Sequence, residues 1–244
     1  MDTALRDLRG TFELHNTIVL NGGDDVSKFI EFCHQNKLKP IQVLILYNEN
    51  YLSKNHFEKL GVKRNTDKLF YKGYEPVILY QTAKYMVGCA KDALVELIRI
   101  TELLQKSQYY VIREKIEAVR STINLENLKG LKECYHETHI VVDCGDYTES
   151  NIHVLDKLNK IVNQFNISLN NLYVPLSFNI KKYEENQVFI TLRNYLVDLE
   201  ENDLVLEEII DKSKKWIQEK FTVIKTINET VIYDSNSYVD SQAF

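Results

Sequence analysis

Hydrophobic and polar residues alternate along 11–20, TFELHNTIVL, where Glu13, His15 and Thr17 occupy every second position. A period of two is typical of a β-strand whose two faces lie in different environments. The next segment, 24–37 (DDVSKFIEFCHQNK), places its apolar residues at helical spacing. The chain therefore opens with a predicted strand followed by a predicted helix.

Strands and helices continue to alternate over the rest of the first half. Strands are predicted at 40–48, 76–85 and 109–119, and an amphipathic helix at 91–107. The resulting order, β-α-β-β-α-β, is that of a ferredoxin-like unit. Such a unit packs both helices on one face of a sheet with strand order 4-1-3-2 and leaves the other face open.

The second half repeats this order and several short sequence patterns. Its strands are predicted at 136–143, 170–179, 187–195 and 221–234, and its helices at 149–165 and 203–221. Glu137-x-His139 matches Glu13-x-His15, TLR matches TAK, and VIKTINE matches VIREKIE. We therefore predict an α+β protein of two tandem ferredoxin-like repeats, related by pseudo-twofold symmetry and packed as one body.

The boundaries of the repeats follow from these matches. The first repeat spans 1–119, a linker spans 120–134, and the second repeat spans 135–244. The first half is longer because of the connection 49–75, which is polar and unusually long for a compact unit. We interpret this connection as a flap or mobile loop.

Composition and charge narrow the class of protein. The chain has 244 residues, of which 44% are hydrophobic, enough for a substantial core. A net charge of −5 argues against general nucleic-acid binding. No apolar run approaches membrane-spanning length, the start resembles no signal peptide, and the four cysteines form no CxxC pair. We expect a cytoplasmic protein with reduced thiols, no cofactor, no metal and no membrane contact.

Alternation within the strands predicts which side chains leave the helices and share the open face of the sheet. The first half contributes Glu13, His15, Thr17, Thr82, Lys84, Arg113, Lys115 and Glu117 to this face, and the second half contributes Glu137, His139, Thr191, Arg193, Lys225 and Glu229. A solvated face with weak cross-strand ion pairs is the simplest interpretation. Recurrence of the same residue types in both halves favours a functional one.

A pseudo-twofold axis would let the two open faces border one groove. His15 and His139 are then the candidate general acid and base. The candidate ligand is a phosphate-bearing small molecule or nucleotide. Lys84, Arg113, Arg193 and Lys225 would hold phosphate oxygens, Thr17, Thr82 and Thr191 would donate hydrogen bonds, and Glu13, Glu117, Glu137 and Glu229 would support the histidines.

The motif His15-Asn16-Thr17 resembles the His-x-Thr/Ser motif of the 2H phosphoesterases, which have two ferredoxin-like lobes. That resemblance implies metal-independent hydrolysis of a phosphodiester by two histidines. The second half departs from the pattern, because Ile140-Val141 follow His139 while His136-Glu137-Thr138 carries the motif in another register. The resemblance covers the architecture and one motif.

The chain is also similar to a family of uncharacterised duplicated proteins, through FELH, KIEA, TLRN and YDSN. This second resemblance implies no known activity.

Other functions stay open or are excluded by the residues. A non-catalytic binding or assembly module, in which the histidines pair with Glu13 and Glu137, competes with the enzyme. A divalent metal held by both Glu-x-His pairs is chemically possible. An RNA-recognition domain is excluded, because the central strands lack the aromatic residues that stack on bases. The glycine loop LNGGDD has no P-loop lysine, and FELHN lacks the Glu-x-Glu-x-Lys of a triphosphate tunnel.

Overall fold

A computed structural model gives the structure of the protein. It describes residues 7–20, 23–48, 74–128, 134–143, 176–179, 187–194 and 222–236, together with Asp211, Lys215 and Gln218. The first half contains β1 (Arg9–Ile18), α2 (Gly23–Gln35), β2 (Lys39–Asn48), β3 (Tyr74–Cys89), α4 (Ala90–Lys106) and β4 (Val111–Val119). The second contains the 3-10 helices η1 (Arg120–Thr122) and η2 (Leu125–Leu128), then β5 (Tyr135–Asp143), β6 (Leu176–Asn179), β7 (Gln187–Asn194) and β8 (Thr222–Asp234).

The mixed α and β content and the element order of the first half agree with the sequence-based prediction. The helices predicted at 149–165 and 203–221 lie outside the described residues, apart from single positions of the second. The connection 49–75 also lies outside them, except for its last two residues, which belong to β3. The tandem ferredoxin-like interpretation of the second half therefore stays a prediction.

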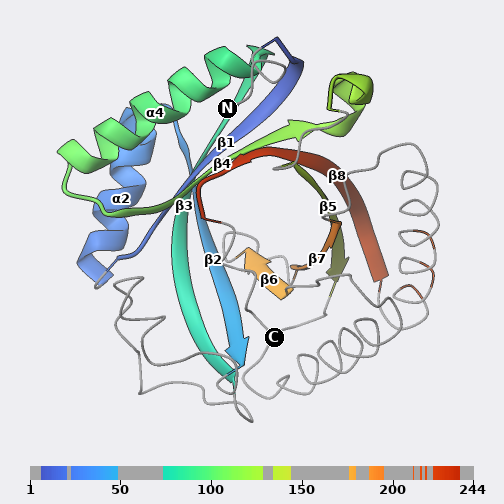
Figure 1. The fold of residues 1–244 in the computed structure, drawn as a ribbon. Helices are drawn as coiled ribbons and strands as arrows, with labels where there is room; N and C mark the ends of the chain where they lie inside the picture. Colours follow the sequence, from blue (N-terminus) through green and yellow to red (C-terminus); the bar gives the residue numbers. More distant parts are fainter. Residues whose placement is uncertain are drawn as a thin grey trace.

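The eight strands form one closed barrel, in the order β1-β3-β2-β6-β7-β5-β8-β4. Each half contributes four neighbouring strands in the order 4-1-3-2, namely β4-β1-β3-β2 and β8-β5-β7-β6. Two antiparallel junctions, β4–β8 and β2–β6, join the halves. Figure 1 shows the ring of strands with α2 and α4 on its outside. Closure gives each described strand a neighbour on both sides.

Helix α4 covers β1 and β4 from outside the ring. Ala93, Leu97, Ile100 and Leu104 recur at helical spacing, and all four are buried. They pack in one hydrophobic core with residues of β1 and β4 whose side chains point out of the barrel: Phe12, Leu14, Ile18, Ile116 and Ala118. The alternate residues of the same strands must therefore point inward.

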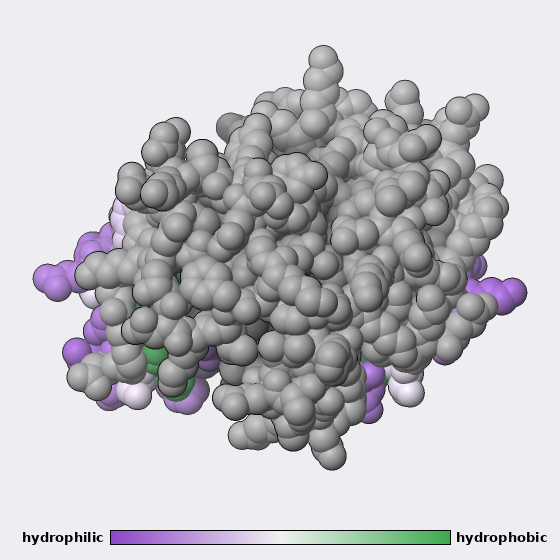
Figure 2. Space-filling view, turned by 90° about the horizontal axis from the view of Figure 1, so that it is seen from below, coloured by the Kyte–Doolittle hydropathy of each residue, from purple (hydrophilic) through white to green (hydrophobic). Residues whose placement is uncertain are grey.

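Figure 2 shows one face of the molecule, coloured by hydropathy for the described residues. On the face shown in Figure 2, the coloured residues are mainly hydrophilic, with a small hydrophobic area at the left, the side on which α2 lies in Figure 1. Between α2 and β2, an apolar pocket of about 290 Å³ is lined by Val26, Phe29, Ile30 and Ile41, among others. Within the described part of the chain, no helix has the length and apolar character needed to cross a membrane.

The packing of α4 predicts the effect of a core truncation. Leu97→Ala should lower the free energy of unfolding by about 2–5 kcal/mol, because it removes a fully buried side chain and leaves a cavity. Ile98→Ala is the matched control, since Ile98 is 46% exposed on the other side of the same helix. It should change stability by less than about 0.5 kcal/mol in urea unfolding followed by circular dichroism. Equal losses in both variants would contradict the assignment of the packed face.

Candidate functional site

The polar face of β1 lies inside the barrel. Glu13, His15 and Thr17 point away from the helices, as predicted, but they are only 7%, 7% and 1% exposed. The expectation of an open, solvated face is wrong. The half-sheets meet at β4–β8 and β2–β6, so their helix-free faces enclose a common interior. Weak solvent-screened ion pairs therefore do not describe this site.

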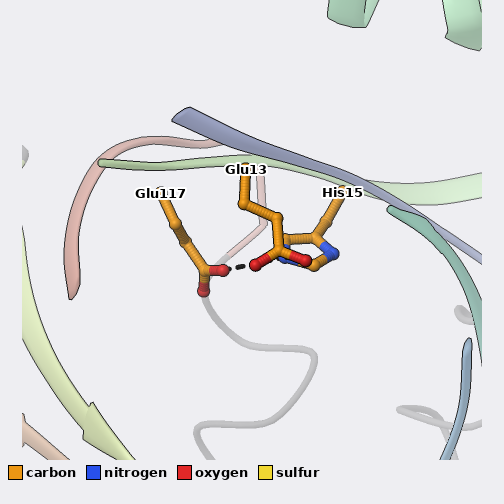
Figure 3. A group of neighbouring side chains, drawn as sticks. All are labelled: Glu13, His15 and Glu117. Atoms are coloured by element: carbon orange, nitrogen blue, oxygen red, sulfur yellow. Dashed lines mark hydrogen bonds and ion pairs between the residues drawn. The ribbon is translucent and has the colours of Figure 1, made fainter. Parts of the chain in front are cut away.

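His15 is the centre of the first of two buried clusters. Its Nε2 lies 2.8 Å from Glu117 Oε2 on β4 and 3.8 Å from Glu13 Oε1. Figure 3 shows Glu13 and His15 on β1 and Glu117 on the neighbouring strand extending toward one another. The Lys115 ammonium forms an ion pair with Glu117 on the same face.

His139 is the centre of the second cluster. Its Nε2 lies 3.2 Å from Glu229 Oε2 on β8 and 3.6 Å from Glu137 Oε2. Its Nδ1 lies 2.8 Å from the hydroxyl of Thr191 on β7, so both ring nitrogens have a partner. The two Glu-x-His pairs thus build similar clusters from the first and last strands of each half.

The two clusters form one network. Glu117, which binds His15, also lies beside His139, because ligand atoms of Glu117, His139 and Glu229 are within 4.8 Å of one another. Lys115 on β4 reaches Glu137 on β5, with Nζ 3.1 Å from Oε2, although β8 separates these strands in the sheet. The contact therefore crosses the interior. The structure brings the two predicted catalytic histidines to one carboxylate.

A second group of ion pairs adjoins these clusters. Arg113 donates from Nε and Nη2 to the two oxygens of Asp234, at 2.9 and 2.6 Å. The Tyr135 hydroxyl donates to Asp234 at 2.6 Å, and the Arg193 guanidinium lies over the Tyr135 ring. Arg193 also pairs with Glu137. These contacts continue the network from β4 and β8 to β7.

Tyr135 and Asp234 were not among the predicted site residues. Asp234 belongs to the YDSN segment, which is one of the short motifs noted in the sequence. That motif could have indicated Asp234 as a site residue. Its neighbours attach the end of β8 to β4: Ser235 Oγ accepts from the Glu114 amide at 2.8 Å, and Asn236 Nδ2 donates to the Ile112 carbonyl at 3.1 Å.

Two predicted phosphate ligands lie on the wrong side of the sheet. Thr82 stands opposite Asn16, and its hydroxyl donates to Asn16 Oδ1 at 3.3 Å on the helix side. Lys84 pairs with Glu96 of α4, with Nζ 2.6 Å from Oε1. The prediction was wrong because the phase of alternation in β3 is shifted by one residue. Gln81, Ala83 and Tyr85 face inward instead, opposite Thr17, His15 and Glu13.

The remaining predicted residues are divided between the interior and its margin. Thr17 accepts from Gln81 Nε2 at 3.0 Å, and Thr191 and Arg193 are buried beside His139 and Glu137. Lys225 stands opposite Val141 on the inward-facing side of β8 but is exposed. Arg113 and Arg193 belong to the interior, each paired with a carboxylate.

Electrostatics favour protonated histidines. Burial alone would lower the pKa of His15, but the charge and hydrogen bond of Glu117 and the charge of Glu13 raise it above the usual 6.5. For His139, burial also lowers the pKa, while the hydrogen bond to Glu229 and the charge of Glu137 produce a net increase. Burial and the nearby charge of Glu117 raise the pKa of Glu229.

The carboxylate–histidine clusters also have the composition of a metal site. Glu13, His15 and Glu117 could together hold a divalent cation, and so could Glu117, His139 and Glu229. Lys115 opposes this, because its ammonium already neutralises the shared Glu117. A metal at either cluster would therefore compete with Lys115 for Glu117.

The fold and site together define an α+β protein whose closed antiparallel barrel encloses a network of ion pairs around two histidines. No protein-family model matches the chain. No curated protein matches it either. Among solved structures, the chain is similar to a dye-decolorizing peroxidase from Bacteroides thetaiotaomicron, with 8% identity over 93% of this chain and 94% of that chain. The TM-score of 0.26 is too low for this likeness to support a functional argument.

The pair between Arg113 and Asp234 predicts a large stability effect. Asp234→Asn should lower the free energy of unfolding by about 3–5 kcal/mol, because it leaves the buried Arg113 charge without its counter-ion. Asp25→Asn, at the exposed pair with Lys28, is the control and should change it by less than about 1 kcal/mol. Urea unfolding of the parent and both variants measures these changes in free energy. A loss below about 1 kcal/mol for Asp234→Asn would show that the interior pair is not formed.

The raised histidine pKa values predict how stability depends on pH. Below about pH 6.5 the imidazoles are protonated in both states, and the stabilising effect of Glu13, Glu117 and Glu229 is fully present. As pH rises through the higher folded pKa values, the unfolded chain has already released its protons, so the free energy of unfolding should fall. The lowered pKa of Glu117 works in the opposite direction below about pH 4.5.

Urea unfolding at a series of pH values measures this dependence. His15→Gln should flatten the decline above pH 6.5, whereas His34→Gln, at an exposed position of α2, should leave the decline unchanged. An identical slope in the parent and His15→Gln would contradict a raised pKa at His15.

Proposed function

We propose that the barrel interior binds a small phosphate-bearing molecule and that His15 and His139 act on it as a general acid and base. The protein would be a metal-independent phosphoesterase or a nucleotide-binding protein. The observation that carries this proposal is that both histidines approach the same carboxylate, Glu117, from opposite halves. Two imidazoles in one buried network are the minimum that acid–base catalysis by a histidine pair requires.

The charge balance of the interior is compatible with an anionic ligand. With both imidazoles protonated, the basic groups Arg113, Lys115, Arg193, His15 and His139 stand against the acidic groups Glu13, Glu117, Glu137, Glu229 and Asp234. Among the described residues, these two sets are equal in number. The raised pKa of Glu229 moves the balance further toward positive charge. A phosphate would then exchange places with a carboxylate at Lys115 or Arg193.

In this proposal the ligand enters next to Glu13. Tyr85 stands opposite Glu13 on the inward-facing side of β3 and is 57% exposed. Burial and a hydrogen bond to Glu13 raise the pKa of the Tyr85 hydroxyl, so this partly exposed side chain contacts the first cluster. A ligand entering beside Tyr85 meets Glu13 and then His15.

The proposal includes the architecture from which the site is built. The equal strand orders of the halves and the antiparallel pairing of β4 with β8 and of β2 with β6 support two tandem ferredoxin-like repeats related by pseudo-twofold symmetry. Such an axis places equivalent residues of the two halves across one interior.

The second candidate is a non-catalytic binding or assembly module. Its supporting observation is that Arg113, Lys115 and Arg193 each already have a carboxylate partner. A network satisfied in this way can serve to specify the fold alone.

Hydrolysis assays distinguish the two candidates. A panel of cyclic and linear phosphodiesters should be turned over by the parent protein in buffer containing a chelator. His15→Gln and His139→Gln should each reduce kcat/KM by about a hundredfold or more, the usual contribution of a general acid or base. His34→Gln is the control, because His34 is an exposed residue on α2.

If the parent hydrolyses the diesters no faster than a His15→Ala/His139→Ala double variant, the proposed enzymatic activity is wrong. The non-catalytic binding module is then the remaining candidate. Hydrolysis that occurs only when a divalent metal is added would contradict the metal-independent mechanism.

A further inference from the structure

The Nε2 atoms of the two histidines have equivalent partners, but their Nδ1 atoms differ. Each Nε2 faces a carboxylate of the last strand in its half, Glu117 for His15 and Glu229 for His139. His139 Nδ1 is bonded to Thr191, 2.8 Å away. His15 Nδ1 is buried and has no hydrogen-bond partner among the described residues.

The strand registers explain this difference. His139 stands opposite Thr191 on β7, and His15 stands opposite Ala83 on β3. Ala83 and Thr191 are therefore equivalent positions, and the first half has a methyl group where the second has a hydroxyl. The sequence match of Thr82 with Thr191 hid this asymmetry because it was one residue out of phase.

A buried polar atom without a partner is costly, so proteins satisfy almost all of them. When the imidazole is protonated, Nδ1 carries a hydrogen that requires an acceptor. The alanine methyl cannot accept it, and Ala83 itself is buried at 2% exposure. Tyr85, which is 57% exposed, lies two residues from Ala83 on the same face of β3.

We propose that His15 Nδ1 is the atom that contacts the ligand, that Ala83 keeps it available by lacking a hydroxyl, and that Thr191 holds His139 in a fixed orientation. The ligand group at this position is an anionic oxygen acceptor such as a phosphoryl oxygen. This proposal rests on the proposed function, which it deepens by giving the two histidines unequal roles. His15 is the residue that touches the ligand, and Ala83 is the specificity-determining position.

The test uses inorganic phosphate as the probe and the imidazole ¹⁵N–¹H correlations of the full chain as the readout. His15→Gln and His139→Gln assign the signals. In the parent, phosphate should shift the His15 Nδ1 resonance more than either His139 resonance. Ala83→Ser adds an acceptor beside Nδ1 and should weaken phosphate binding about tenfold, the value of one charge-assisted hydrogen bond.

Two matched variants control for packing. Ala83→Gly leaves the position without a hydroxyl, and its affinity should stay within about threefold of the parent. Thr191→Ala removes the hydroxyl on the other side and should change the His139 Nδ1 resonance, while His15 Nδ1 should remain the resonance that phosphate shifts most. If Ala83→Ser fails to fold, the comparison of His15 and His139 shifts in the parent still decides the question.

The outcomes separate this proposal from the general function. Phosphate binding at His15 without hydrolysis of any diester would support the ligand contact and overturn the enzyme. If the parent and Ala83→Ser hydrolyse a diester with equal kcat and KM, the enzymatic activity is supported. The proposed role of Ala83 is then wrong. A shift centred on His139, or no shift at either histidine, would overturn the ligand contact.

Discussion

Closure of the two half-sheets through β4–β8 and β2–β6 is the constraint on which the rest of the structure depends. In the first half, α2 and α4 cover the outer face of the sheet. Closure turns the opposite face of each half-sheet inward. Charged side chains that would be weakly paired in water are thereby placed in an interior where an unpaired charge is costly. The pair between Arg113 and Asp234 stands at one junction, so the contact that joins the halves also neutralises a buried charge.

The interior of the barrel is lined by buried charged side chains. Hydrophobic residues of similar volume often stabilise a protein as well as a buried ion-pair network does. Here Glu117 connects both histidines, Lys115 connects Glu117 with Glu137, and Arg193 continues the connection to Tyr135. Clusters of ionisable groups with shifted pKa values are common at functional sites, and this supports the proposed function.

Both halves contain a Glu-x-His pair, and the residues around the two pairs differ. Thr191 satisfies His139, whereas its equivalent Ala83 leaves His15 Nδ1 without a partner. Tyr85 is 57% exposed beside the first cluster, whereas Arg193 at the equivalent position is buried and forms an ion pair with Glu137. The proposal of one anchored and one available histidine rests on these differences.

The sequence by itself determined the alternation of strands and helices in the first half, the duplication of Glu-x-His, and the side of β1 that leaves the helices, since these depend on local periodicity. Only the tertiary structure decided that this side is buried, because burial depends on strand pairing between halves that are distant in the chain. Pairing also set the phase of β3, which moved Thr82 and Lys84 to the helix side and brought Ala83 opposite His15. A one-residue shift reverses the faces of a strand, and polar residues on both sides of β3 gave local alternation no means to detect it.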